Sequence, residues 1–304
     1  MSWAKYKRLS SSKDLSIFRR GTTASDGGGG AANDPDAQAY IDALDAAGYT
    51  VSGAEETAIN NHFLDLKGTG PNNSTYDWWT GCVRLLPFIG TNAAQQGIEG
   101  QNPASSINFY GGMTFSSIGA EGNGTNAYFD FFAPNEIPDN YNNSIWVYET
   151  KNLNDNNQIL YLGELQGNVG YGIRFWFPDK LEGRHGFGNY AFRTPDNTLV
   201  PPTTGGFYGT TRHQTCEEGG FFDLYLRGAK YTANLSTCGI FTNSADQVPG
   251  LARRVYMWTS YVYGQFSPCA IGYALITTGV STTTEEAALR ACVEAFMTAL
   301  NREV

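Results

Sequence analysis

The 304-residue sequence has few charged residues and no long apolar run. Aspartate, glutamate, lysine and arginine make up only 16% of the chain. No stretch approaches the roughly 18 to 20 consecutive apolar residues that cross a bilayer. The residues after Met1 carry charge and lack the apolar segment of a secretion signal. These absences predict a chain that is made in the cytoplasm and has no membrane span.

Cysteine and histidine are also scarce. The five cysteines are scattered, and neither they nor the three histidines have the spacing of zinc ligands. We therefore expect buried reduced thiols, structural histidines and no metal site. The residues concerned are Cys82, Cys216, Cys238, Cys269, Cys292, His62, His185 and His213.

Sequence motifs for catalysis are missing. No strand-like segment carries two carboxylates at alternate positions, and Phe115–Gly119 has only the trailing glycine of a serine nucleophile elbow. Gly122–Ala127 has the glycines of a dinucleotide-binding loop, but a strand follows where that motif opens a helix, so a hairpin turn at Asn123–Gly124 explains it better. We predict no catalytic, cofactor or metal-binding residues, and hence no enzyme. A glycosidase with its acids on separate strands is the alternative.

Aromatic residues and glycine are abundant. Aromatics form 14% of the chain and glycine occurs 36 times, which suits short strands joined by tight turns. In Ile173–Phe177 and Phe222–Leu226, apolar residues occupy one face and charged residues the other, as a sheet with one buried face requires. The pattern predicts an antiparallel β-sandwich or jelly roll over residues 76–280. Further strands are expected at Ser106–Tyr110, Ala127–Phe132, Ser144–Tyr148, Gly206–Thr211, Val255–Tyr263 and Cys269–Ile276.

Helix signals lie near the two ends of this region. Capping residues begin each predicted helix, and glycines end the first two. The predicted helices run from Asp34 to Gly48, from Ser52 to Gly68 and from Thr282 to Leu300. The first two form a helical pair within residues 34–75, and the third, within residues 281–304, is expected to pack on that pair and close the domain.

The first 33 residues are predicted to be a basic arm and a flexible linker. The linker contains four consecutive glycines, Gly27–Gly30, which have no side chains to bury. The net charge of the whole chain is −9, and such an acidic body argues against nucleic acid as the main partner. The arm is either a solvated tail or a docking segment for an acidic partner surface. Its candidate docking residues are Lys5, Lys7, Arg8, Arg19 and Arg20.

Aromatic side chains are candidates for binding sugars, because a flat apolar face with a polar edge suits a pyranose ring. Core packing and subunit contacts need the same residues, so each candidate has a structural alternative. The candidate glycan contacts are Trp78, Trp79, Trp176 and Trp258.

Several segments together resemble a known family, the structural proteins of tailed phages that carry a concanavalin A-like or laminin G-like domain. The resemblance spans residues 34–304 and rests on the order and spacing of its pieces. It implies a lectin-type jelly roll displayed on virions, with no catalytic residues to carry over. Departures include Thr91, where the family has a second glycine. The matching pieces are Asp34–Ile41, Ala58–Asn60, Leu64–Gly68, a strand at Leu86–Gly90, Gly111–Gly112, Asn123–Tyr128, and the ending with Val293, Phe296, Leu300, Arg302 and Val304.

The resulting hypothesis is a virion structural protein of a tail fibre, a head fibre or a capsid decoration. It would contact other virion proteins through the arm and form a homo-oligomer, such as a trimer. A host-glycan receptor-binding module is the alternative, and a polysaccharide depolymerase is a third reading. No cofactor is expected, although the oxygen-rich loop Asp139–Asn143 permits a Ca²⁺ without requiring one.

Overall fold

The computed structural model describes the chain in segments. These are residues 32–129, 142–151, 162–163, 169–176, 180–187, 191–193, 206–213, 221–226, 228–234, 256–257, 259–260, 265–266, 269–278 and 282–303. Met1–Ala32 and Asn33–Val304 are separate compact units, and the fold below belongs to the second. The basic arm, the Gly27–Gly30 linker, Trp258 and Asp139 lie outside the described residues.

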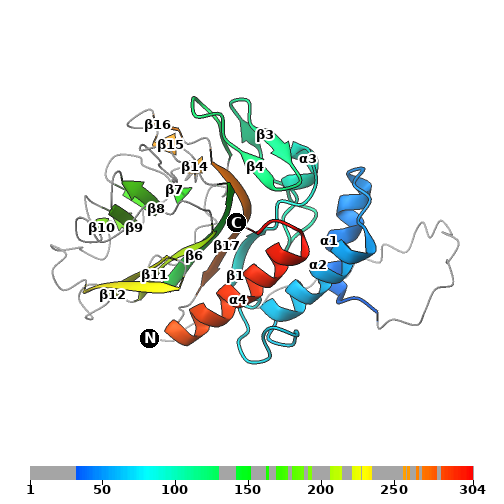
Figure 1. Ribbon diagram of the computed structural model, residues 1–304, viewed down its shortest axis with the longest axis horizontal. Helices are drawn as coiled ribbons and strands as arrows, with labels where there is room; N and C mark the ends of the chain where they lie inside the picture. Colours follow the sequence, from blue (N-terminus) through cyan, green and yellow to red (C-terminus); the bar gives the residue numbers. More distant parts are fainter. Residues whose placement is uncertain are drawn as a thin grey trace, which may run out of the picture. The chain divides into compact units, whose positions relative to one another are not determined.

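The three predicted helices are present, and their caps are those expected from the sequence. Helix α1 (Pro35–Ala46) begins after Asp34, whose carboxylate accepts hydrogen bonds from two backbone N–H groups. Helices α2 (Gly53–Leu66) and α4 (Thr283–Ala299) each begin with a complete capping box. Figure 1 shows α4 beside α2, and a ring stack between His62 and Phe296 joins them. A short helix, α3 (Ala93–Gln96), was not predicted.

An antiparallel eight-stranded sheet forms the centre of this unit. Its order is β13-β12-β11-β6-β17-β4-β3, and β1 also pairs with β17. Strands β4 and β1 share one edge of β17, because β4 pairs with its first residues and β1 with its last. The strands are β1 (Cys82–Leu86), β3 (Thr114–Ser116), β4 (Gly119–Glu121), β6 (Asn142–Lys151), β11 (Gly206–His213), β12 (Phe221–Leu226), β13 (Ala229–Asn234) and β17 (Ala270–Thr278).

Smaller antiparallel sheets complete the described strands. Strands β8 (Val169–Trp176), β9 (Lys180–Phe187) and β10 (Ala191–Arg193) form one of three strands. The two-stranded sheets are β2 (Phe109–Tyr110) with β5 (Tyr128–Phe129), β7 (Leu162–Gly163) with β14 (Tyr256–Met257), and β15 (Thr259–Ser260) with β16 (Gln265–Phe266). The prediction of helices with antiparallel sheets is thus confirmed as a fold class. Among the described residues, no helix is long and apolar enough to span a membrane.

Some predicted strands have different bounds. The strand expected at Leu86–Gly90 ends at Leu86, because Pro87 has no N–H for a ladder bond. The chain then turns through Phe88, with φ +47°, and Gly90, with φ +110°. The strand predicted at Val255–Tyr263 is represented by the short β14 and β15.

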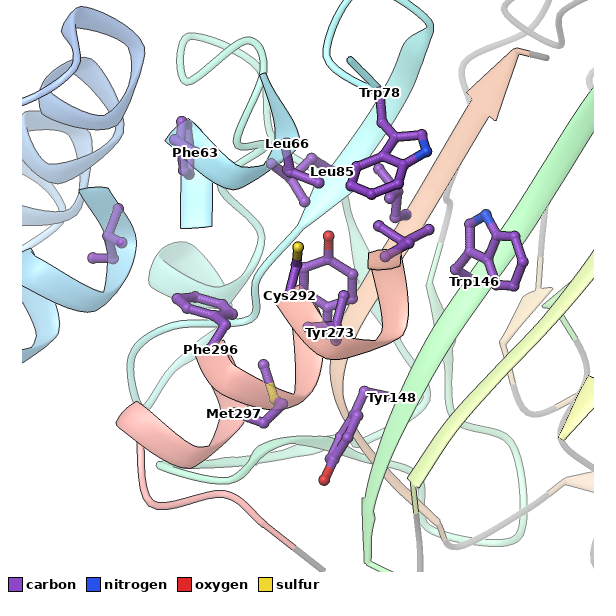
Figure 2. Packing of buried hydrophobic residues seen from close by; sticks show 14 of the residues in the cluster. Phe63, Leu66, Trp78, Leu85, Trp146, Tyr148, Tyr273, Cys292, Phe296 and Met297 are labelled. Carbon is purple, nitrogen blue, oxygen red and sulfur yellow. The ribbon is translucent and has the colours of Figure 1, made fainter. Parts of the chain in front are cut away.

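The central sheet is buried on both faces near β6 and β17. Along β6, Trp146 and Tyr148 belong to one hydrophobic cluster, whereas Ile145 and Val147 belong to another. This alternation follows from the period of two in a strand. The first cluster, shown in Figure 2, lies between the sheet and α4 and includes Cys292 and Met297. The second cluster joins the opposite face of the sheet to the β2–β5 ribbon.

The charged face of β12 is buried, contrary to the sequence prediction. Asp223 and Tyr225 share this face, and both are 0% exposed. The Asp223 carboxylate pairs with Lys230 of β13 at 2.8 Å. Alternation shows which residues of a strand share a face, but it does not show whether that face is covered. Asp223 is covered because α4 packs over it.

Candidate functional site

The β2–β5 ribbon places four aromatic rings on two opposite faces. Phe109 pairs with Phe129, and Tyr110 pairs with Tyr128. Because successive strand residues point to opposite faces, the two phenylalanines share one face and the two tyrosines share the other. The ribbon is short, so these two residue pairs define it.

The phenylalanine face anchors the ribbon in the second cluster. Phe129 is fully buried and its ring meets Phe88 at 5.6 Å and Phe109 at 5.5 Å between centroids. Phe109 also contacts Phe115 of β3 at 4.8 Å. Edge-to-face aromatic contacts of this kind add to the stability that burial supplies. The ribbon is therefore held firmly against the main sheet.

The tyrosine face reaches solvent. Tyr110 is 37% exposed, the one exposed large hydrophobic side chain among the described residues. Its ring stacks on the half-buried ring of Tyr128, with 4.7 Å between centroids and 17° between planes. We call this pair the Tyr110–Tyr128 platform. Two nearly parallel rings with phenolic edges provide an apolar surface beside polar groups.

The loop that leads into β5 is held by the side chain of Asn123. Its Oδ1 accepts hydrogen bonds from the N–H groups of Thr125, Asn126 and Ala127, at 2.9 to 3.1 Å. Its Nδ2 donates to the carbonyl of Gly111 and to Asn126 Oδ1. The turn expected here is present, but it is not a hairpin, because it joins β4 of the main sheet to β5 of the ribbon.

Gly111 allows this loop to approach β2 closely. A methyl group at Gly111 would lie 1.8 Å from the carbonyl oxygen of Asn126, and the φ of Gly111 is +74°. The structure thus brings together two separate sequence blocks, Gly111–Gly112 and Asn123–Tyr128. Together they place the exposed side chains of Asn123, Thr125 and Asn126 in the loop that ends at the platform.

Replacing Asn123 with alanine is expected to loosen this loop without unfolding the domain. Three backbone N–H groups lose their protein acceptor, which costs about 1 kcal/mol for a solvent-accessible set. Amide hydrogen exchange at Thr125, Asn126 and Ala127 should therefore become about fivefold faster. Mass spectrometry or NMR of exchanging amides measures this directly.

Asn123→Asp is the matched control. The carboxylate keeps the acceptor oxygen for the three N–H groups and removes the amide donor to the Gly111 carbonyl and to Asn126 Oδ1. Protection of the three amides should remain close to that of the unaltered protein. Equal exchange in the unaltered chain and in Asn123→Ala would show that Asn123 does not hold the loop.

The predicted glycan contacts lie elsewhere. Trp78 is 8% exposed and packs in the first cluster, as Figure 2 shows, which argues against a stacking face for a sugar. Trp79 is half-buried, its ring 5.1 Å from that of Phe63, and the Lys67 ammonium lies 4.9 Å from its centroid. The side chain of Trp176 and all of Trp258 lie outside the described residues, so their role stays a prediction.

The described histidine and cysteines occupy the interior. His62 is 1% exposed, and its Nε2 lies 3.0 Å from the hydroxyl of Tyr273. Burial lowers the pKa of His62 to about 3, so the ring is neutral. Cys82, Cys269 and Cys292 are buried, as expected from the sequence, and burial raises the pKa of Cys292 to about 12. Within the described part of the chain, no three potential ligands gather around a metal position.

The carboxylates of Asp223 in β12 and Glu286 in α4 are both buried. Glu286 of α4 is 1% exposed. Its oxygen lies 3.5 Å from Arg290, and burial raises the pKa of Glu286. Burial raises the pKa of Tyr225, and the negative charges of Asp223 and Glu286 raise it further. Each acid thus has a cationic partner, Lys230 within the sheet for Asp223 and Arg290 within α4 for Glu286.

The platform itself was not singled out from the sequence. Its signal is the mirrored order of Phe109-Tyr110 and Tyr128-Phe129. Two such dipeptides place like residues opposite each other when their strands pair antiparallel. Recognising the site required the pairing, which the spacing of the two segments does not reveal.

Three solved structures show what this fold is similar to. A sialidase from Trypanosoma rangeli, in complex with 2,3-difluorosialic acid, aligns with TM-score 0.51 and 11% identity over 79% of this chain and 39% of the sialidase. Domain 4 of an extracellular arabinanase from Geobacillus stearothermophilus, in complex with arabinotriose, aligns with TM-score 0.49 and 11% identity over 69% and 98% of the two chains. The receptor-binding domain of botulinum neurotoxin mosaic serotype C/D aligns with TM-score 0.39 and 9% identity over 69% and 50%. No family model and no curated protein sequence matches the chain.

The similarity to these structures bears on two predictions from the sequence, the absence of enzyme activity and the virion role. The prediction that the chain is not an enzyme is contradicted, because the chains of similar fold include a sialidase. That prediction relied on missing motifs, whereas acids contributed by separate strands leave no motif in one segment. None of the three structures is a virion protein, so they lend no support to the virion role. This chain spans well under half of the sialidase.

Proposed function

We propose that this protein binds carbohydrate and that the Tyr110–Tyr128 platform is the contact surface. The exposed tyrosine pair carries the proposal, because stacked rings at a surface offer a flat apolar face that sugar C–H groups can cover. This reading corresponds to the glycan-binding alternative raised by the sequence.

The loop beside the platform supports the same ligand class. Exposed amide and hydroxyl groups of Asn126 and Thr125 are suited to hydrogen bonds with sugar hydroxyls, which both donate and accept. Asn123 already holds the loop in place, so little conformational entropy is lost when a ligand binds. Aromatic surface and preordered polar groups are what a compact sugar site combines.

The sialidase of similar fold was solved with a sialic acid derivative, which makes sugars the first ligands to test. In the same proposal, the sheets form a concanavalin A-like jelly roll, as the phage-family resemblance implies. We also propose that this binding module is displayed on a virion. It rests on the resemblance alone.

Replacing Tyr110 with alanine is expected to weaken glycan binding about tenfold, equivalent to about 1.4 kcal/mol. The truncation removes the exposed ring and leaves the anchored phenylalanine face intact. A glycan array followed by calorimetric titration of the best ligand measures the change in Kd.

Tyr110→Phe provides the matched control, because it keeps the ring and removes only the hydroxyl. Its Kd should stay within about threefold of the unaltered value, which is less than the effect of one well-made hydrogen bond to a charged group. Glycan binding that is unchanged in Tyr110→Ala, with an unchanged melting temperature, would place the binding site elsewhere.

A further inference from the structure

The segment that forms the platform contains no basic residue. From Leu85 to Thr150 the sequence has no lysine, arginine or histidine. The same stretch contains six acidic residues, which are Glu99, Glu121, Asp130, Glu136, Asp139 and Glu149. Both strands of the ribbon and the loop that Asn123 holds lie within it. Positive charge is therefore absent from the whole segment that builds the site.

The two cations at the ends of this segment are paired with its own acids. Arg84 is 8% exposed and lies 3.4 Å from Glu99, which is 2% exposed. Lys151 pairs with Glu121, two residues before Asn123. Each flanking positive charge thus compensates a carboxylate of the segment.

Charged and neutral sugars need different interaction partners in such a site. A carboxylate or sulfate loses hydration when it binds, and arginine, lysine or converging N–H groups normally compensate that loss. A neutral sugar needs only hydrogen bonds and ring contact. A net charge of −9 on the chain also disfavours the approach of an anion.

We infer that the ligand of the Tyr110–Tyr128 platform is an uncharged glycan rather than a sialylated, uronic or sulfated one. This inference rests on the proposed carbohydrate-binding function. It assigns to this chain a ligand class different from the sialic acid derivative bound to the sialidase of similar fold. The selectivity follows from the absence of cations in the segment, and the stacking rings do not discriminate by charge.

The test uses the full chain and pairs of glycans that differ only in charge. Each pair contains a neutral oligosaccharide and its sialylated form, or a galactan oligosaccharide and the galacturonan oligosaccharide of equal length. The neutral member should bind at least about tenfold more tightly at low ionic strength, a difference of about 1.4 kcal/mol. Equal or tighter binding of the anionic members would overturn the inference and leave the proposed function standing. Absence of binding to any member of a broad array would remove the proposed function itself, and the inference with it.

A charge introduced into the loop provides a second test. Thr125 is exposed, so Thr125→Lys places an ammonium beside the platform without disturbing the core. Binding of the anionic glycans should tighten about threefold or more at low salt, and the gain should disappear at high salt because exposed charges are screened. Thr125→Gln controls for the change in size. No gain in Thr125→Lys would show that charge does not govern the selectivity.

Discussion

Replacing Trp146 with alanine is expected to lower the free energy of unfolding by about 3 to 5 kcal/mol. Trp146 is fully buried in β6, its ring parallel to Phe207 at 5.4 Å and 5.5 Å from Tyr225. Gly209 lies against it so closely that a methyl group there would meet the indole at 1.7 Å. Because the surrounding sheet and α4 cannot collapse into the space, a cavity remains. Urea unfolding, followed by circular dichroism, measures the loss.

Trp146→Phe is the control for this change. It keeps an aromatic ring in the cluster and removes the indole N–H, which has no hydrogen-bond partner among the described residues. Removing an unsatisfied buried donor is favourable, and it offsets part of the free energy that is lost with the packing contacts. We expect a destabilisation of less than about 2 kcal/mol. A loss below about 1 kcal/mol in Trp146→Ala would contradict the close packing of Trp146 against Phe207 and Tyr225.

Acid is expected to destabilise the protein through His62. The pKa of His62 is about 3 in the folded protein and about 6.5 when exposed. Between these values the unfolded chain binds the additional proton, so a fall in pH favours unfolding. The stability lost should be about 1.4 kcal/mol for each pH unit below 6.5, or about 2.7 kcal/mol at pH 4.5. Above pH 6.5 the ring is neutral in both states and the loss vanishes. Urea unfolding at a series of pH values measures it.

His62→Gln is the matched variant, because it retains polar atoms that can meet the Tyr273 hydroxyl and does not titrate. The pKa values of Glu99 and Glu286 are raised by burial and change stability in the opposite sense, but they do so in both proteins. The difference between the two pH curves therefore isolates His62. Parallel curves between pH 4.5 and 7 would mean that His62 is not held neutral in the interior.

Local signals in the sequence predicted the helices well. Asp34, Ser52 and Thr282 cap their helices through their own side chains, so the interactions that start each helix lie within a few residues. Strands such as β6 and β17 were also recognised, because their alternating and apolar runs are long. Strands of two or three residues, such as β3 and β7, carry too little pattern to be recognised alone.

The platform depends on pairing between strands that are separated in the sequence. The sequence pattern does not reveal which strands pair. Asn123 was expected in a turn, but its partner Gly111 becomes apparent only when the loop lies against β2. Asp223 was expected on the solvent face of its strand, because alternation does not reveal that this face is buried as well. Trp78 was a candidate glycan contact by residue type, with core packing as the alternative, and its position after α2 places it in the core.

The most direct measurement of the central claim is an NMR titration with a neutral oligosaccharide, in which tyrosine rings and backbone amides are followed together. The ring signals of Tyr110 and Tyr128, and the amides of Gly111, Thr125 and Asn126, should shift in proportion to ligand occupancy, with little change at α2 or α4. Saturable binding that shifts other residues and leaves Tyr110 and Tyr128 unchanged would contradict the account.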